Sequence, residues 1–311
     1  MNFVRPFRSD SLVVAALVSV MLFNDASAQV AYNVMTDVPY TAEGNPAQRM
    51  DLYLPNTQGS RPIVYLFHGG CFTAGDKAET ADTAQMLASN GFVVANINYT
   101  LANAANPATL YPTSWMDVMK AVRFMRVNAA SYGIDTTKQA SWGESAGGTI
   151  AGLLSTKPVF TPSWTQDTYS PSMQAAVVAH ARWDFTHRDP ALPAGALDCA
   201  ERWMGVSRTA NPTKFANSNP LNYIGRYTPH ITLQCNYDDT TVLPEPHCEA
   251  ARSRMRSFKR PHQSLNGAGG HFIAGSVQKE AMYGLMARFG LVPTATEAPA
   301  PVPATAPSSG G

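Results

Sequence analysis

The stretch Gly143-Glu144-Ser145-Ala146-Gly147 constrains the fold more than any other part of this chain. It follows a strand-like run at residues 138–142 and leads into a helix-like run at residues 148–154. A serine between two such glycines, with a strand before and a helix after, predicts a sharp turn that holds the serine above the edge of a sheet. Negative charge is favoured at that helix N-terminus. We therefore expect Ser145 to act as a nucleophile.

Two other segments supply partners for such a serine. The apolar run Ile63–Phe67 predicts a buried central strand, and it ends in His68-Gly69-Gly70-Cys71-Phe72, where glycines let backbone N–H groups turn toward a reacting carbonyl. A strand-like run at residues 231–235 precedes two aspartates, and residues 267–270 form a glycine-rich loop before a histidine. Serine, then aspartate, then histidine is the chain order of α/β-hydrolases.

These segments define the expected roles. We expect Ser145 to attack an ester carbonyl while His271 takes its proton, and an aspartate, Asp239 or Asp238, to orient the histidine. His262 is the rival base, and it lies inside a predicted strand. The remaining histidines of this region are interpreted as surface or structural residues: His180, His187, His230 and His247.

The oxyanion of the reaction needs its own donors. We expect the backbone N–H groups of Gly69, Gly70 and Ala146 to supply them, with the N–H of Cys71 as a replacement. His68 is expected to hydrogen-bond the loop rather than to transfer protons.

Matching stretches along most of the chain resemble a known family. The matching stretches are Met50–Pro55, the H-G-G loop with Gly75-Asp76-Lys77, Asn98-Tyr99, Tyr132–Asp135 and the run 143–148. The chain is similar to α/β-hydrolase esterases of the hormone-sensitive-lipase-like and carboxylesterase group. Secreted bacterial members of the feruloyl- and acetylxylan-esterase type are the nearest likeness. The resemblance covers about residues 52–289. Two residues depart from the family pattern. Cys71 stands where relatives often carry glycine or an aromatic residue, and Thr100 stands where they often carry arginine.

The resemblance implies an α/β-hydrolase fold, a mostly parallel central sheet with helices on both faces and a small cap at about residues 181–229. It also selects Asp239 over Asp238, because in relatives the acid immediately precedes a T-T-V or x-x-V stretch, and this chain has Thr240-Thr241-Val242 there. Trp183, Phe185, Trp203 and Tyr223 are candidate walls of a substrate pocket or plain packing residues.

The pattern of strands and helices favours the same architecture. Strands are expected at residues 48–54, antiparallel to the rest, and at 62–67, 92–97 and 173–178; helices are expected at 80–90, 114–130 and, within the cap, near 197–204. Such alternation predicts a parallel sheet covered on both faces, with its site at the carboxyl ends of the strands.

Both ends of the chain differ in character from the middle. The first 28 residues are predicted to be a signal peptide, with a membrane anchor as the alternative. They contain the basic residues Arg5 and Arg8, an apolar run at residues 12–23 and a cleavage motif, Ala26-Ser27-Ala28. The apolar run is too short for a spanning helix. Residues 292–311 are rich in proline and alanine and predict a disordered tail. Residues 29–291 then form one catalytic domain of a secreted or periplasmic protein.

Composition and motifs exclude several other classes. The net charge of +1 gives no reason to expect a nucleic acid partner or a charged membrane surface. The sequence has no phosphate-binding loop and no zinc-binding pattern, so we expect no metal and no organic cofactor. Four cysteines in an exported chain allow up to two disulfides. Cys235–Cys248 would staple the Asp239 loop and Cys71–Cys199 would tie the oxyanion loop to the cap; the alternative is that some are free.

The sequence thus predicts a serine hydrolase that cleaves esters through an acyl-enzyme. The family resemblance implies short-chain acyl or aryl esters as substrates, free or linked to polysaccharide. A serine peptidase or amidase on the same scaffold is the first alternative. A non-catalytic binding module is the second, although such proteins typically lose a member of the triad.

Overall fold

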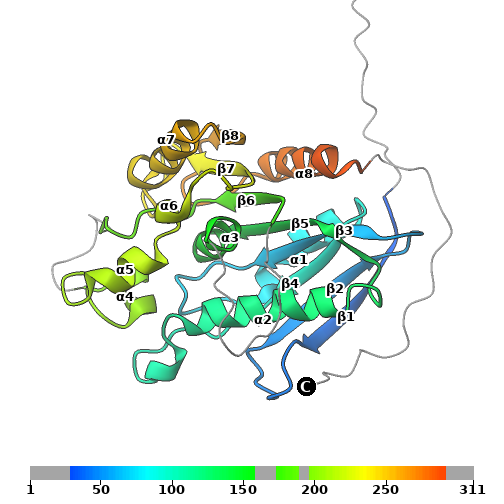
Figure 1. Cartoon of the computed structure of the whole chain (residues 1–311), viewed down its shortest axis with the longest axis horizontal. Coiled ribbons are helices and arrows are strands. Elements are labelled where there is room, and N and C mark those ends of the chain that lie inside the picture. Colours follow the sequence, from blue (N-terminus) through cyan, green and yellow to red (C-terminus); the bar gives the residue numbers. More distant parts are fainter. Residues whose placement is uncertain (1–28, 158–172, 189–195, 292–311) are drawn as a thin grey trace, which may run out of the picture.

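A computed structural model describes residues 29–157, 173–188 and 196–291. The expected signal peptide at 1–28 and the expected tail at 292–311 lie outside the described residues. An eight-stranded sheet in the order β1-β2-β4-β3-β5-β6-β7-β8 forms the centre (Figure 1). The strands are β1 Tyr32–Pro39, β2 Arg49–Pro55, β3 Arg61–Phe67, β4 Val93–Ile97, β5 Ile134–Glu144, β6 Ala175–Ala179, β7 His230–Asn236 and β8 His262–Gly267.

Most of the sheet is parallel. β2 pairs antiparallel with both β1 and β4, and every other neighbouring pair runs parallel. The prediction of an early antiparallel strand at 48–54 is therefore confirmed. Parallel strands need crossover connections, and helices fill most of them here. The helices are α1 Ala81–Ala88, α2 Thr113–Val127, α3 Ala146–Thr156, α4 Cys199–Met204, α5 Pro212–Ser218, α6 Pro220–Tyr223, α7 Ala250–Ser257 and α8 Gly275–Phe289, with short η1 Lys77–Thr80, η2 Pro107–Thr109 and η3 Glu245–Glu249.

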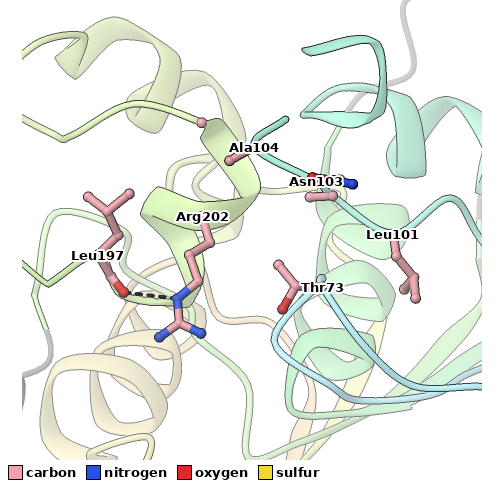
Figure 2. A pocket seen from close by; sticks show the side chains of 8 residues that line it. Thr73, Leu101, Asn103, Ala104, Leu197 and Arg202 are labelled. Carbon is pink, nitrogen blue, oxygen red and sulfur yellow. Dashed lines mark hydrogen bonds between the residues drawn. The ribbon is translucent and has the colours of Figure 1, made fainter. Parts of the chain in front are cut away.

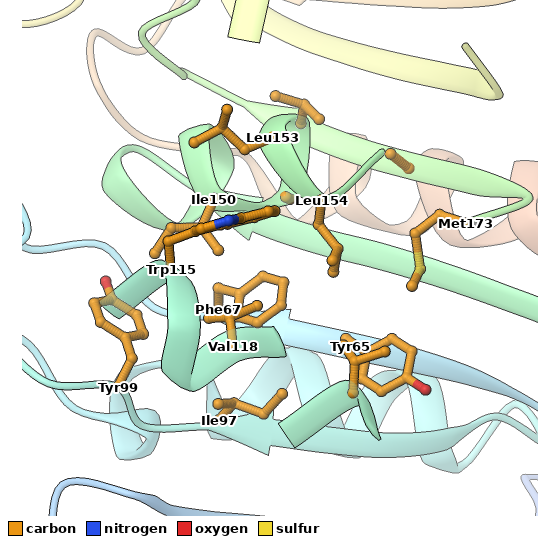
Figure 3. Packing of buried hydrophobic residues seen from close by; sticks show 14 of the residues in the cluster. Tyr65, Phe67, Ile97, Tyr99, Trp115, Val118, Ile150, Leu153, Leu154 and Met173 are labelled. Atoms are coloured by element: carbon orange, nitrogen blue, oxygen red, sulfur yellow. The ribbon is translucent and has the colours of Figure 1, made fainter. Parts of the chain in front are cut away.

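Each face of the sheet has its own apolar cluster. On one face α2, α3 and α7 cover alternate residues of the central strands, and Figure 3 shows Trp115, Val118 and Ile150 packed over Phe67 and its neighbours. On the other face α1 and α8 cover the intervening residues, such as Leu66 and Trp142. Central strands buried on both faces explain the continuous apolar runs in the sequence. The expected parallel sheet with helices on both faces is confirmed.

The boundaries differ from expectation where tertiary contacts decide them. β5 begins at Ile134, several residues before the run seen in the sequence, because its first part pairs with Arg61 ahead of a register shift. The segment between β6 and β7, expected to form a cap, carries α4, α5 and α6 in its described part. Among the described residues, no helix combines the length and apolar character needed to cross a membrane.

Candidate active site

Ser145 lies at the junction of β5 and α3, in the middle of the sheet. Its backbone has φ 55° and ψ −119°, a region that non-glycine residues rarely occupy. The N–H of Ser145 donates to the carbonyl of Ala179 at the end of β6 over 2.9 Å, which fixes the turn to the neighbouring strand. The strained turn predicted from the glycine pattern is therefore present. Strain of this kind is characteristic of functional sites.

A continuous chain of hydrogen bonds runs from Ser145 through His271 to Asp239. Nε2 of His271 lies 2.9 Å from Oγ of Ser145, and Nδ1 of His271 lies 2.8 Å from Oδ2 of Asp239. The carboxylate accepts only, so Nδ1 carries the proton and Nε2 offers its lone pair to the serine hydroxyl. The three residues come from the ends of β5, β7 and β8, which share one edge of the sheet (Figure 1). This arrangement suits proton abstraction from the serine.

The carboxylate of Asp239 is buried and fully occupied. Oδ1 accepts the backbone N–H groups of Thr241 and Val242 at 2.8 and 2.9 Å, and only 3% of the residue is exposed. Burial by itself would raise the pKa of Asp239, but hydrogen bonds from His180 and His271 outweigh it and lower that pKa well below its usual range. Asp239 is therefore a stable anion beside His271.

Asp238 has a different task. Its side chain is exposed and accepts the backbone N–H groups of Gly269 and Gly270 at 3.1 Å. These contacts fasten the glycine loop that carries His271. This contact needs both loops in place, so a single segment of sequence does not reveal it.

His180 is the residue at this site whose proximity the sequence did not reveal. It follows β6 directly, has a positive φ of 48° and is buried. Nδ1 of His180 lies 3.0 Å from Oδ2 of Asp239, and its ring meets that of His271 edge-on with centroids 5.5 Å apart. The interpretation of His180 as structural did not place it beside the triad. Its position directly after a buried strand was the available signal, since Ser145 and Asp239 also follow strands.

The other rival histidines lie elsewhere. His262 begins β8, at the end of the strand opposite to the loop of His271, and its Nδ1 contacts the carbonyl of Arg260. His230 begins β7 at that same far edge. His247 is buried and accepts the N–H of Asp184, whereas the side chain of His187 is 56% exposed. None of these four histidines contacts Ser145.

The H-G-G loop lies against the serine. A Cβ on Gly69 would stand 3.5 Å from Cβ of Ser145, so the loop backbone borders the space in which an oxyanion would form. Gly70 has φ 98°, and a Cβ there would meet the carbonyl of Ala74 at 2.1 Å, so only glycine fits this turn. The ring of His68 stacks on Tyr99 at 4.4 Å, and its Nδ1 contacts the carbonyl of Gly69. The expected structural role of His68 fits these contacts.

Two disulfides fasten the loops of the site. Cys71 is bonded to Cys199, the first residue of α4, and Cys235 is bonded to Cys248 in η3. Of the pairings that the sequence left open, the structure has these two, and no cysteine of the chain is free. The first bond ties the loop after the oxyanion glycines to α4, and the second closes the loop that carries Asp239.

The aromatic residues expected as pocket walls are mostly core residues. Trp183, Phe185 and Trp203 are each at most 1% exposed. Trp203 stacks on Phe72 at 4.0 Å and donates its indole N–H to Ser114. These three residues belong to the segment between β6 and β7 and are buried in the apolar cluster on that face of the sheet, so they are not available to a substrate.

A cavity of about 540 Å³ opens between the oxyanion loop and α4. Figure 2 shows Arg202 and Leu197 on one side of it and Leu101 and Asn103 on the other, with Thr73 between them. Its remaining lining residues are Ala102, Ala104 and Gly205. No triad residue lines this cavity, so we do not assign it as the acyl pocket.

One cluster at the site has the composition of a metal site. The ligand atoms of His180, Asp239 and His271 lie within 4.8 Å of one another. Both Nδ1 atoms face the same carboxylate oxygen, which is the geometry of two hydrogen bonds. Glu144 lies near the cluster, and burial raises the pKa of its carboxyl, with the electrostatic interaction with His180 and His271 opposing that shift.

The strand order and the serine turn define an α/β-hydrolase fold. A carbohydrate esterase from gut microbiota superimposes with a TM-score of 0.73, covering 85% of this chain and 99% of that one at 19% identity. The BD-FAE family model matches residues 50–251, and the chain belongs to the BD-FAE family.

Two curated relatives are similar over part of their length. The probable carboxylic ester hydrolase LipM of Mycobacterium tuberculosis is 28% identical over 66% of this chain and 48% of its own length. The kynurenine formamidase of Danio rerio is 29% identical over 58% of this chain and 56% of its own. The chain thus spans about half the length of these curated relatives.

Proposed function

We propose that this protein is a serine hydrolase that cleaves carboxylic esters through an acyl-enzyme. The observation that carries the proposal is the linked pair of contacts at His271, 2.9 Å to the serine hydroxyl and 2.8 Å to the carboxylate, at a strained strand–helix turn. The names of relatives such as LipM support ester chemistry. A binding module would have no need for this alignment.

The reaction follows from the geometry. Oγ of Ser145 attacks the ester carbonyl as its proton passes to Nε2 of His271, and the carbonyl oxygen becomes an oxyanion. Backbone N–H groups of Gly69, Gly70 and Ala146 are assigned to that oxyanion. Collapse breaks the C–O bond, and His271 returns the proton to the leaving alkoxide. Water, deprotonated by the same nitrogen, then attacks the acyl carbon; the bond to Oγ of Ser145 breaks, the acid leaves, and His271 returns the proton to Oγ.

The anion of Asp239 keeps the proton of His271 on Nδ1, so that Nε2 is free to act as the base in these reaction steps. It also stabilises the imidazolium that forms in each half-reaction. Since the carboxylate is held by two backbone N–H groups on Oδ1, it stays oriented while the charge on His271 changes.

The substrates we propose are short-chain acyl or aryl esters, including acyl groups carried on polysaccharide. The support is the membership in the BD-FAE family and the fold shared with a carbohydrate esterase. The proposal also includes export of the chain after cleavage before Gln29. The two disulfides fit an oxidising compartment. N-terminal sequencing of protein from the periplasm or medium tests this part.

Hydrolysis of p-nitrophenyl esters of increasing acyl length tests the activity. We expect turnover of acetate or butyrate that is lost as a fluorophosphonate labels Ser145. The control is Ser145→Ala, which should be neither active nor labelled. A folded protein with no turnover and no labelling would contradict the proposal and favour the binding module.

An amidase is the second candidate, because a relative is named as a formamidase. The same triad can expel an amine if His271 protonates it. Matched aryl formamide and aryl formate substrates distinguish the two activities: a higher kcat/KM for the formamide would make the protein an amidase.

A further inference from the structure

We propose that His180 is a positioning residue of the site, which donates its Nδ1 proton to Asp239 and thereby holds that carboxylate in place for its contact with His271. The inference rests on the proposed function, because it assigns to a fourth side chain a share in the same proton transfer. It concerns a contact that the triad itself does not require.

The two histidines share one carboxylate oxygen. Oδ2 of Asp239 lies 3.0 Å from Nδ1 of His180 and 2.8 Å from Nδ1 of His271. Because Oδ1 already accepts two backbone N–H groups, these two contacts complete the four acceptor positions of the carboxylate. An anionic oxygen can only accept, so both histidines carry a proton on Nδ1.

The backbone of His180 adopts an unfavourable conformation that directs its side chain to this oxygen. Its φ of 48° is a left-handed conformation, which is uncommon outside glycine but better tolerated by histidine and asparagine. The N–H of His180 donates to the carbonyl of Gln234 on β7 over 2.9 Å, which continues the parallel pairing of β6 with β7. The turn therefore points the ring along the edge of the sheet to the end of β7, where Asp239 follows.

Burial makes the contact effective. The side chains of His180 and Asp239 are 1% and 2% exposed, so water does not compete for Oδ2. Without the hydrogen bond from His180, Oδ2 of Asp239 would keep only His271 as a side-chain partner, and the carboxylate would be less firmly oriented toward His271.

Other charged groups surround the pair and have to stay constant in any test. Glu144 precedes the nucleophile, and the ring of His247 borders the same small cavity as His180. Arg182 contacts the carbonyl of Thr241 on the Asp239 loop, and Asp238 holds the glycine loop. None of these groups is altered by a substitution at position 180.

Two substitutions separate donation from packing. His180→Asn keeps an N–H donor near the place of Nδ1 and tolerates the left-handed backbone, whereas His180→Leu keeps bulk and removes the donor. Each is assayed for kcat/KM against pH in the presence of a chelator, so that no metal occupies the cluster. The matched control is His230→Asn, at the opposite end of β7.

We expect His180→Leu to lower kcat/KM by about ten- to a hundredfold. The loss should lie mainly in kcat, with KM little changed. His180→Asn should stay close to the native profile, and His230→Asn should not change it. A native kcat in His180→Leu, with only a lower melting temperature, would overturn the proposal.

A measurement on the native protein covers the case in which His180→Leu does not fold. Nitrogen-15 NMR of labelled histidine reports the tautomer of His180 and the titration of His271 without any turnover. A proton on Nδ1 of His180 supports the proposal, and a proton on Nε2 alone overturns it. If no ester is hydrolysed but the tautomer holds, the proposed activity fails while the contact to Asp239 stands.

Discussion

Gly147 packs directly against the backbone of Phe67. A Cβ on Gly147 would stand 2.2 Å from the carbonyl oxygen of Phe67, which is closer than real Cβ atoms approach any atom. The first turn of α3 therefore touches the end of β3, and this contact brings the serine turn up to the H-G-G loop. The second glycine of the serine motif is required for close approach and not for an unusual φ.

Gly147→Ala should consequently destabilise the protein. Either α3 or the loop after β3 has to shift, and we expect a loss of about 1–3 kcal/mol in the free energy of unfolding, together with reduced ester turnover. The matched control is Gly284→Ala in α8, where a Cβ would meet only the flexible end of Gln263 at 3.2 Å. That change should be neutral or stabilising. Urea denaturation of both variants measures the difference, and equal effects would contradict the packing argument.

The two neighbouring aspartates should differ sharply in their effect on turnover. Asp239→Asn removes the anion beside His271, and we expect kcat to fall by about a thousandfold or more. Asp238→Asn keeps an oxygen that can accept the N–H groups of the glycine loop, and we expect a loss below about tenfold. Steady-state kinetics with one p-nitrophenyl ester decides. The reverse order would move the acid to Asp238.

Replacement of the nucleophile or the base should separate activity from stability. Ser145→Ala and His271→Ala should each lower kcat by about a thousandfold or more, since triad members act as a unit. Unfolding should stay nearly unchanged, because the side chain of His271 is only partly buried and Oγ of Ser145 contacts that partly buried ring. Thermal unfolding and ester turnover measured on the same samples provide the check. Substantial remaining activity in either variant would rule out the assigned roles.

Buried histidines should make the fold sensitive to acid. Burial, aided by the charge of Arg182, lowers the pKa of His247 from 6.5 to about 3. Between these values the unfolded chain binds a proton that the folded protein does not, so stability falls as pH falls through this window, by up to about 1.4 kcal/mol per pH unit. His247→Asn retains an acceptor for the N–H of Asp184 and should flatten this dependence.

Denaturation midpoints between pH 7 and pH 4 measure that slope, for which exposed His187→Asn is the control. His230, whose pKa burial lowers to about 4, contributes a remaining slope in both variants. A native slope in His247→Asn would show that another group is responsible.

The sequence predicted the parts of this molecule that depend on local patterns. The apolar runs 62–67 and 92–97 predicted the central strands, and the glycines around Ser145 predicted the serine turn. Each of these patterns lies within a few residues of the sequence. The choice of Asp239 rested on a family resemblance, and the structure places that residue beside His271.

The rest depended on contacts between distant segments. His180 reaches Asp239 only because β6 and β7 are neighbours, and Trp203 is buried only because Phe72 stacks on it. From sequence alone, a tryptophan in an irregular segment is equally consistent with a pocket wall and with the core. Only the residue that packs against it decides between the two. The same reason explains why the anchoring of the glycine loop by Asp238 was not foreseen.

Whether the disulfide between Cys71 and Cys199 forms depends on the redox state of the compartment in which the chain folds. It spans 128 positions and attaches the loop beside the nucleophile to α4, so oxidation is needed to join these two parts of the site covalently. Without it, the loop would rely on noncovalent contacts such as the stacking of Phe72 on Trp203. A chain folded among reducing thiols and one folded in an oxidising compartment would share a sequence and a sheet, yet they would differ in how firmly the oxyanion donors are held.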